Sequence, residues 1–569
     1  MRMNKKEVLG ALEEIAVYLE IQGENAFRVS AYRKAAQALE KDERTLEELG
    51  DPAQLTGIGK GLGALIEDLR DHGSTELLDD LKKQIPEGLV PLLKLPGLGG
   101  KKVGRLYREL DIVNAEQLLE ACEENRIQEL SGFGKKSEEK IKEAVENMGK
   151  RPERLALPQV LEGAEAIGRL LDETPGTLRW ELAGSFRRGR ETVKDLDFIL
   201  AVEDADSVQK HLLALDNIVE VIGSGTTKIS LELSYGDVVL PVDFRLVEDR
   251  SFATTLHHFT GSKDHNVMMR QLAKDRGEKI SEYGVEKESD GTMMYFDSEE
   301  AFYEHFGLPW IPPEQREGHD ELETSYDSLI RVEDIRGDLH MHTTWSDGAQ
   351  SLEEMVDRCL EKGYSMMAIT DHSKYLRVAN GLDEEKLKRQ HEEIRRLEKE
   401  KEIRIFTGTE MDILPDATLD FSDDILETVD FVIASIHSSF QQDEEQIMKR
   451  LEAACRNPHV DMIAHPTGRI LGKREGYKVN IDRLLDLAVE TNTILELNAN
   501  PNRLDLSADI LEKARKKGVL TAINTDAHRF SMLEDMAAGV KTARRAGLDR
   551  ENVINTWTAE RLEEHLNGS

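Results

Sequence analysis

The sequence contains few cysteines and no long apolar run. Its three cysteines, Cys122, Cys359 and Cys455, are spread over 569 residues and form no Cys-x-x-Cys site. A disulfide framework is therefore not expected, and a reducing cytosol fits this usage. No stretch reaches the roughly 20 apolar residues of a membrane-spanning helix, and residues 1–20 have the pattern of an amphipathic helix, unlike a signal peptide.

Basic residues are scarce compared with acidic ones. The chain has 75 lysines and arginines against 111 aspartates and glutamates, which gives a formal net charge of -36. This charge excludes a protein that coats nucleic acid by bulk electrostatic attraction. Any contact with DNA must be local, through backbone amides, metal ions and a few placed cations. A chain of this length is expected to form three or more domains.

A glycine-serine turn, two arginines and two carboxylates lead into an apolar strand at residues 183–200 (AGSFRRGRETVKDLDFIL). Alternate side chains of a strand face the same side, so Asp195 and Asp197 can share divalent metal ions. Backbone N–H groups of the turn and the arginines can donate to phosphate. The alternative for an Asp-x-Asp pair is an edge strand with a solvated acidic face.

A third carboxylate follows on a later strand-like run. Residues 238–245 (VVLPVDFR) contain Asp243. If this strand lies beside the strand of Asp195 and Asp197, the three carboxylates complete a two-metal site for phosphoryl transfer.

A Gly-apolar-Gly turn recurs three times before residue 150. The copies are LTGIGKG at 55–61, LPGLGGKK at 95–102 and LSGFGKK at 130–136. The glycines allow a tight turn, and free N–H groups at the start of the next helix can meet a phosphate. One copy would be an ordinary helix-helix turn, but three resemble the helix-hairpin-helix motif, which contacts the DNA backbone. The residues expected at the DNA are Gly57, Gly59, Lys60, Gly97, Gly99, Lys101, Gly132, Gly134 and Lys135.

In this order, the hairpins and the three-aspartate motif resemble a family X DNA polymerase. The resemblance implies a helix-hairpin-helix domain over residues 1–85, fingers with two such motifs over 86–153, an α/β nucleotidyltransferase palm over 154–248 and a thumb over 249–318. It also implies that Asp195, Asp197 and Asp243 are catalytic and bind Mg²⁺ or Mn²⁺.

The same resemblance assigns residues to the incoming nucleotide. Ser185 and Arg188 would hold the triphosphate, and HFTGS at 258–262 would lie against the sugar. The full set is Gly184, Ser185, Arg188, His258, Phe259, Gly261, Asn266 and Arg270. His258 replaces the tyrosine of the family, which puts the exclusion of ribonucleotides in question. Leu65 stands at the position of the Schiff-base lysine of lyase-active relatives, and because leucine has no amine, lyase activity through that residue is not expected.

Beyond a linker expected at 319–334, seven short apolar runs each end in histidine, carboxylate or amide side chains. Their alternation with helical stretches predicts a parallel α/β domain, in which the carboxyl ends of the strands form one rim. Histidine with carboxylate suits zinc, manganese or iron. A single histidine more often has a structural role, and His391, His459 and His565 are interpreted as ordinary surface histidines.

Residues 335–569 resemble the PHP (polymerase and histidinol phosphatase) domain, whose pattern opens with His-x-His and closes with Asp-x-His. The resemblance implies a distorted (β/α)7 barrel with two or three Mn²⁺, Zn²⁺ or Fe²⁺ ions. Its ligands would be His340, His342, Asp347, His372, Glu410, His437, His465, Asp526 and His528. Arg469 and Asn498 are expected to bind substrate phosphate or to order a ligand. The activity implied is a 3′→5′ exonuclease, with abasic-site endonuclease or 3′-phosphatase activity in addition, and a phosphatase of free small molecules is the competing interpretation.

The main hypothesis is a multidomain DNA-directed DNA polymerase with a C-terminal nuclease that fills short gaps in base-excision repair. Its partners would be gapped or primed double-stranded DNA and dNTPs, without a membrane. A monomer is expected, in the cytoplasm and at the nucleoid when on DNA. Template-independent nucleotidyl transfer by the same palm is a second hypothesis, and a DNA-end scaffold with an inactive palm is a third.

Overall fold

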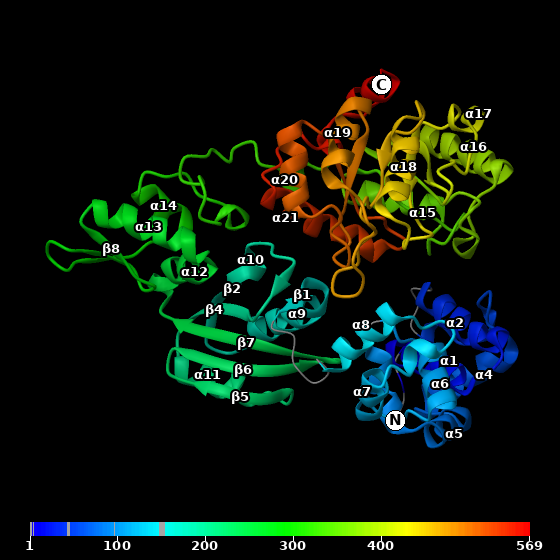
Figure 1. Ribbon diagram of the computed structural model, residues 1–569. Helices are drawn as coiled ribbons and strands as arrows, with labels where there is room; N and C mark the ends of the chain where they lie inside the picture. Colours follow the sequence, from blue (N-terminus) through cyan, green and yellow to red (C-terminus); the bar gives the residue numbers. More distant parts are fainter. Residues whose placement is uncertain (1–2, 4, 42–45, 96, 147–153, 569) are drawn as a thin grey trace. The chain divides into compact units, whose positions relative to one another are not determined.

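The computed structural model describes residues 3, 5–41, 46–95, 97–146 and 154–568 of the chain (Figure 1). The chain forms two compact units, Met1–Pro152 and Glu153–Ser569. The boundary expected at residue 153 lies outside the described residues, as does Pro96 of the second glycine turn.

The first unit consists of helices around an apolar core. Residues at helical spacing, such as Leu12, Ile15 and Leu19, are fully buried there. The helices are α1 (Lys5–Gln22), α2 (Ala26–Lys41), α3 (Leu46–Leu49), α4 (Lys60–His72), α5 (Glu76–Gln84), α6 (Gly100–Leu110), α7 (Ala115–Glu123) and α8 (Lys135–Glu146). A 3-10 turn and then a glycine turn precede α4, α6 and α8, and these 3-10 turns are η1 (Pro52–Gln54), η3 (Pro91–Lys94) and η4 (Ile127–Glu129).

The second unit begins with a five-stranded sheet whose strand order is β2-β4-β7-β6-β5. The strands are β2 (Thr177–Leu182), β4 (Leu196–Val202), β5 (Ile218–Ser224), β6 (Lys228–Tyr235) and β7 (Val238–Val247). Helices α9 (Leu157–Glu173) and α11 (Ala205–Leu212) share a core with Phe198 and Phe244 of the sheet. Three short elements lie near the strands of this sheet in the sequence: helix α10 (Gly184–Arg187) and the paired strands β1 (Leu155–Ala156) and β3 (Thr192–Val193).

A smaller subdomain follows, built on Phe302 and Tyr303, which are fully buried. Its elements are α12 (Phe252–Thr260), α13 (Lys263–Asp275), β8 (Glu278–Ile280), β9 (Val285–Lys287), β10 (Met293–Met294) and α14 (Glu299–His305). The segment after α14 has little regular structure, yet Arg316 in it is fully buried and its Nη1 lies 2.6 Å from Oε1 of Glu299. This segment is therefore packed against the subdomain.

Seven parallel strands form the last sheet, in the order of the sequence. They are β11 (Gly337–Asp338), β12 (Met366–Ile369), β13 (Arg404–Asp412), β14 (Phe431–Ser435), β15 (Met462–Ile463), β16 (Ile494–Asn498) and β17 (Thr521–Asn524). A parallel bridge between Met341 and Ala527 joins the two ends of the sheet. The sheet thus curls into a nearly closed barrel, filled by side chains such as Phe406 and Phe431.

Helices cover the barrel on the outside (Figure 1). They are α15 (Leu352–Glu361), α16 (Glu384–Glu400), α17 (Asp423–Leu426), α18 (Glu444–Cys455), α19 (Ile481–Thr491), α20 (Ala508–Lys517), α21 (Met536–Arg545) and α22 (Ala559–Asn567). The predicted combination of helical hairpins, an α/β palm, a thumb and a seven-stranded barrel is confirmed.

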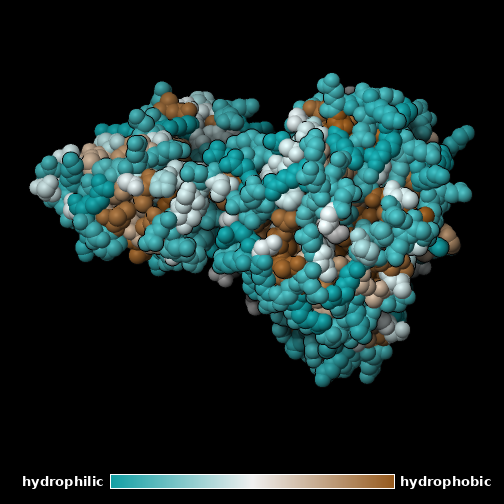
Figure 2. Space-filling model, turned by 90° about the horizontal axis from the view of Figure 1, so that it is seen from above, coloured by the Kyte–Doolittle hydropathy of each residue, from teal (hydrophilic) through white to brown (hydrophobic). Residues whose placement is uncertain are grey.

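The surface is mainly hydrophilic on the face drawn in Figure 2, where hydrophobic residues form small separate groups. None of the helices in the described part of the chain has the length and apolar character to cross a membrane. The three cysteines are buried and unpaired, as their spacing predicts.

Candidate active sites

The three palm aspartates meet at one end of the β4-β7 pair. These strands are parallel, and Asp197 lies opposite Asp243 in the register, while Asp195 immediately precedes β4. Leu196 and Phe198 are buried in the core, whereas both carboxylates of the Asp-x-Asp pair are only partly buried. The alternation of the strand therefore turns Asp195 and Asp197 to the side away from the core.

The closeness of these carboxylates changes their protonation. Burial and the charge of Asp243 raise the pKa of Asp195. Burial, followed by the charges of Asp195 and Asp243, raises the pKa of Asp197 to about 7. Because carboxylates this close repel each other unless a cation lies between them, the cluster has the electrostatics of a divalent metal site.

Lys228 reaches the cluster from the neighbouring strand β6. Its Nζ lies 2.6 Å from Oδ2 of Asp243. The sequence pattern did not single out this lysine, because only the antiparallel pairing of β6 with β7 brings it to the aspartates. Its ammonium group is the counter-ion of Asp243 in this structure.

Gly184 lies directly against the aspartates. Its φ of +60° falls in the left-handed region, and a Cβ at this position would collide with Oδ2 of Asp197. Only glycine fits here, so the glycine-serine turn is held against the carboxylate cluster. Ser185 and Arg188 follow in and just after α10.

The residues expected around the sugar and base lie in α12 and α13. The rings of His258 and Phe259 are 4.9 Å apart, and the Arg245 guanidinium lies 4.3 Å from the Phe259 ring. Asn266 donates from Nδ2 to the His258 carbonyl at 2.7 Å, and its buried Oδ1 has no hydrogen-bond partner among the described residues. Such an orphaned acceptor is typical of a site that binds a ligand.

Gly261 and Arg270 complete the set. A Cβ at Gly261 would lie 3.2 Å from Nη1 of Arg188, so the α12-α13 turn is in contact with that guanidinium. Arg270 is exposed on α13. Burial lowers the pKa of His258, which leaves its imidazole neutral at neutral pH.

The three glycine turns of the first unit have the same geometry. Gly57, Gly97 and Gly132 all have φ between +78° and +97°, and the apolar residue after each is buried. The backbone N–H of that apolar residue donates to the leucine three positions earlier at 3.0–3.1 Å in all three copies. Gly59 and Gly99 cap α4 and α6 without a side-chain hydrogen bond.

The surroundings of these turns leave room for a ligand. Among the described residues, and apart from the immediate chain neighbours, no heavy atom lies within 4 Å of a Cβ built on Gly57, Gly59, Gly97, Gly99 or Gly134. Lys60, Lys101 and Lys135 are exposed at the start of the following helices. The arrangement offers free backbone N–H groups and a cation at each turn, which suits phosphate.

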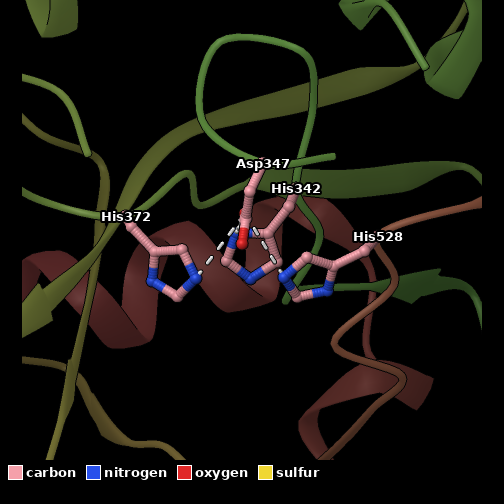
Figure 3. A group of neighbouring side chains, drawn as sticks. All are labelled: His342, Asp347, His372 and His528. Carbon is pink, nitrogen blue, oxygen red and sulfur yellow. Dashed lines mark ion pairs between the residues drawn. The ribbon is translucent and has the colours of Figure 1, made fainter. Parts of the chain in front are cut away.

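The barrel brings the expected histidines and carboxylates together at the carboxyl ends of its strands. One group contains His342, Asp347, His372 and His528 (Figure 3). Oδ1 of Asp347 lies 3.4 Å from Nε2 of His528, 3.7 Å from Nε2 of His372 and 4.0 Å from Nδ1 of His342. One divalent ion with four ligands fits among these atoms.

Two further groups share members with the first. His340, His342, Glu410 and Asp526 form one, and His372, Glu410 and His437 form the other. Oε2 of Glu410 lies 3.3 Å from Nε2 of His340 and 2.9 Å from Nδ1 of His372. Nε2 of His465 lies 2.9 Å from the other oxygen of Glu410. Glu410 lies within β13, which continues to Asp412, and it is the hub of the cluster.

Unsatisfied polar atoms test whether ions fit this cluster. Nε2 of His340, Nδ1 of His342, Nδ1 of His372 and Oε2 of Glu410 are buried, and although some of them lie close to one another, none makes a hydrogen bond of suitable geometry among the described residues. Buried polar atoms of this kind are costly unless a ligand or ion satisfies them. The donor set of imidazoles and carboxylates is the one that Zn²⁺, Mn²⁺ and Fe²⁺ prefer, so divalent metal ions fit.

Carboxylates behind the cluster orient its histidines. Oε1 of Glu496 lies 2.7 Å from Nδ1 of His340, and its Oε2 accepts the backbone N–H of His465 at 2.7 Å. Oδ1 of Asp412 lies 3.3 Å from Nδ1 of His437. Sequence motifs did not single out either carboxylate, although an acidic residue within a buried apolar strand is a usable signal for each.

Protonation of the histidines follows the same contacts. Burial lowers the pKa of His437, but the neighbouring carboxylates of Glu410 and Asp412 outweigh it and raise the pKa to about 10. Burial and the adjacent rings of His528 and His372 lower the pKa of His342 to about 3.

Comparison with known proteins decides the family. The chain is 56% identical over 567 residues to the DNA polymerase/3′-5′ exonuclease PolX of Bacillus subtilis (strain 168), with 99% of each chain covered. The chain belongs to the family X DNA polymerases that carry a PHP domain. Family models match in the corresponding order: a helix-hairpin-helix domain at 3–75, a SAM-like helix-hairpin-helix tandem at 89–147, a DNA polymerase beta thumb at 255–317 and a PHP domain at 338–500.

Other relatives of this family X protein match only a part of the chain. Rat DNA polymerase lambda is 23% identical over 335 residues, which is 54% of this chain and 55% of the relative. A probable phosphatase of Thermoanaerobacter sp. (strain X514) is 29% identical over 231 residues, which is 38% of this chain and 89% of the relative.

Three residues of this family X chain have hydrogen-bond partners that sequence patterns did not predict. Arg469 donates to both carboxylate oxygens of Glu191, at 2.6 and 3.0 Å, so its guanidinium is paired with this carboxylate in the structure. Asn498 donates from Nδ2 to Oδ2 of Asp526 at 3.1 Å and thereby orients this carboxylate. His391, interpreted as an ordinary surface histidine, is partly buried, with Nε2 3.4 Å from the Gly408 carbonyl oxygen.

Proposed function

We propose that this protein is a DNA-directed DNA polymerase that fills short gaps during base-excision repair, and that its PHP domain is a metal-dependent 3′→5′ exonuclease. One observation carries the proposal: a three-aspartate palm and a three-group metal cluster occur in one chain whose sequence matches PolX over nearly its full length. The domain division proposed is 1–85, 86–153, 154–248, 249–318 and 335–569, with a connection at 319–334.

In the palm, Asp195, Asp197 and Asp243 would hold Mg²⁺ or Mn²⁺. These ions supply activation of the attacking oxygen and stabilisation of the charge on the transferred phosphoryl group. The chain's own residues then position the dNTP. Ser185 and Arg188 donate to the triphosphate, and Asn266 offers its free Oδ1 to the nascent base pair.

His258 and Phe259 would lie against the sugar of the nucleotide. A histidine here has a smaller ring than the family's tyrosine, so the exclusion of a 2′-hydroxyl depends on how closely the ring approaches the sugar. Leu65 has no amine, and lyase activity through this position is not proposed.

The three hairpins would bind gapped or primed double-stranded DNA through its backbone. Free N–H groups at the glycine turns, with Lys60, Lys101 and Lys135, meet phosphates without reading the base sequence. This mode of binding needs no basic surface overall, which agrees with the net charge of -36. The protein would act as a monomer in the cytoplasm, at the nucleoid when it is bound to DNA.

In the barrel, the nine residues of the PHP pattern would hold two or three Mn²⁺, Zn²⁺ or Fe²⁺ ions. These ions supply Lewis-acid activation of water for attack on a phosphodiester. Glu496 and Asp412 orient His340 and His437, and Asn498 orients Asp526. Abasic-site endonuclease or 3′-phosphatase activity would use the same centre.

The experiment uses a labelled one-nucleotide gap, with and without dNTPs, across Mg²⁺, Mn²⁺ and Zn²⁺. Asp243→Ala should abolish nucleotide addition and leave the nuclease intact, and His340→Ala should do the reverse. Loss of both activities in either folded variant would refute the assignment of two independent sites. Equal extension of a single-stranded primer would favour template-independent transfer instead.

The phosphatase relative supports a second candidate for the barrel, hydrolysis of free small-molecule phosphoesters. Both candidates use the same metal ligands. Hydrolysis of a nucleoside monophosphate much faster than of a DNA 3′ end, by wild type and not by His340→Ala, would favour the second.

A further inference from the structure

Residues of the barrel domain hold the palm turn that carries Arg188. Nζ of Lys541, on α21, donates to the carbonyl oxygen of Phe186 at 2.9 Å. Arg469 pairs with Glu191 at 2.6 Å. The turn expected to bind the triphosphate is thus fixed at both of its ends by side chains of the PHP domain.

The middle of this turn is connected to α21 directly, since Nη1 of Arg545 donates to the Arg188 carbonyl oxygen at 3.5 Å, and also through one carboxylate, that of Glu317. Its Oε1 lies 2.6 Å from Nη1 of Arg545, and its Oε2 lies 2.6 Å from Nη2 of Arg190. Nε of Arg188 is 3.5 Å from the same Oε1 that Arg545 holds. Glu317 therefore faces three guanidinium groups, two from the palm and one from the barrel.

The charges around Glu317 leave an excess of positive charge. Burial raises the pKa of this carboxyl, but the hydrogen bond and charge of Arg545 and the charges of Arg190 and Arg188 outweigh it and lower the pKa. Glu317 is thus ionised at neutral pH, and one negative charge faces three positive ones. The surplus suits a polyanion such as a triphosphate.

The guanidinium of Arg188 is held in place by a hydrogen bond, but not all of its N–H groups have a hydrogen-bond partner. Its Nη1 donates to the carbonyl oxygen of Thr260, and its side chain is 14% exposed. Its Nε is buried and makes no hydrogen bond among the described residues, and the Glu317 oxygen that lies 3.5 Å away, Oε1, accepts a hydrogen bond from Arg545. Without Arg545, that oxygen would be free to form a close pair with Arg188, which would then compete with the nucleotide for the guanidinium.

We propose that Arg545 of the PHP domain is a positioning residue for nucleotide addition: by occupying Glu317, it keeps Arg188 available for the triphosphate of the dNTP. The inference rests on the role proposed above for Arg188. It makes the nuclease domain a contributor to the nucleotide affinity of the polymerase site.

The test uses the full-length protein on a one-nucleotide gap and measures KM for the dNTP, kcat and the equilibrium Kd for the dNTP in the DNA complex. The variants are Arg545→Ala, Arg545→Lys, Arg188→Ala and the double variant. Arg544→Ala is the matched control, because Arg544 lies on the same helix and pairs with Glu314 at 3.2 Å, away from Arg188. Thermal unfolding of each variant reports whether it folds.

Arg545→Ala should raise KM and Kd for the dNTP about fivefold, within the usual range of coupling between sites, with little change in kcat. Arg545→Lys should restore most of the affinity, because an ammonium group also engages Glu317. Arg544→Ala should leave both constants unchanged. In the Arg188→Ala background, Arg545→Ala should have no further effect, since it acts through Arg188.

Three results would overturn the inference. Arg544→Ala could weaken dNTP binding as much as Arg545→Ala, which would indicate a general loosening of this contact. Arg545→Ala could leave the affinity unchanged while Arg188→Ala weakens it, which would spare the proposed function. Arg188→Ala could itself leave the affinity unchanged, which would remove the proposed role of Arg188 and this inference with it.

Discussion

The ammonium group of Lys228 lies 2.6 Å from Oδ2 of Asp243, in the position of a counter-ion to the palm carboxylates. Asp195 and Asp197 lie near Asp243 at the same end of the strands. The pKa values of both carboxyl groups are raised, chiefly because the groups are buried. The lysine therefore provides some of the positive charge that a divalent ion would provide, and the two compete for Asp243.

Replacement of Lys228 by alanine should make the palm bind Mg²⁺ more tightly, because the competing ammonium is gone. The Mg²⁺ concentration that gives half-maximal nucleotide addition on a one-nucleotide gap should fall by about twofold to fivefold, the size expected for one exposed ion pair. Lys228→Arg is the control that keeps the charge. An increased requirement for Mg²⁺ in Lys228→Ala would show that the lysine assists the ion instead of competing with it.

Gly184→Ala should abolish nucleotide addition, because its Cβ would collide with Oδ2 of Asp197 and its φ of +60° disfavours any side chain. Gap filling and the nuclease should be measured on the same preparation, and the nuclease should be retained. Gly223→Ala is a matched control in β5 of the same sheet, where the added Cβ meets no heavy atom within 4 Å in the described part of the chain beyond its own neighbours in sequence. Normal gap filling by Gly184→Ala would contradict the described turn.

Glu496→Gln should weaken metal binding in the barrel, because the carboxylate that orients His340 at 2.7 Å would lose its charge. Loss of such an outer partner typically lowers metal affinity by about 10-fold to 100-fold. Metal content after dialysis against graded chelator measures the effect independently of activity. Gap filling should be unaffected, and an unchanged metal content would exclude this role for Glu496.

His391→Gln should reduce the loss of stability in mild acid. Burial lowers the pKa of His391 to about 4, while the unfolded chain has the ordinary value of 6.5. Between these values the unfolded state binds the extra proton, so the free energy of unfolding falls as the pH falls. Between pH 7 and pH 5, the free energy of unfolding should fall by about 2 kcal/mol less in the variant than in the wild type. Solvent screening of this partly buried group makes the difference smaller.

Denaturant unfolding of metal-free protein at the two pH values gives this difference. Metal-free samples are needed because metal release would otherwise dominate in acid. Glutamine keeps a donor for the Gly408 carbonyl, so equal stability of variant and wild type is expected near pH 7. The same loss in both proteins between pH 7 and pH 5 would show that His391 is protonated without cost.

The sequence predicted those features that depend on local pattern. The barrel followed from apolar runs that end in metal-binding side chains, since parallel strands place their carboxyl ends on one rim. Alternation along β4 predicted the common side of Asp195 and Asp197. The hairpin glycines followed from a repeat whose geometry is set within a few residues.

The features that sequence patterns did not predict depend on contacts between segments that are far apart in the chain. Lys228 reaches Asp243 only through the pairing of β6 with β7, and Arg469 finds Glu191 some 280 positions away in the chain. Glu496 contacts His340, and the two residues come from parts of the barrel that are far apart in the sequence. Such contacts are set by tertiary packing, which periodicity does not encode.

The register of β4 against β7 has an evolutionary consequence. Asp197 and Asp243 are direct partners across parallel strands, while the chain between them runs through α11 and then through β5 and β6, the two strands that extend the sheet beyond β7. Insertions and deletions in that connection leave the two carboxylates facing each other, whereas a shift of one residue within either strand would turn one of them to the opposite face. Length variation among homologues should therefore accumulate between residues 203 and 237 and be absent from the two strands.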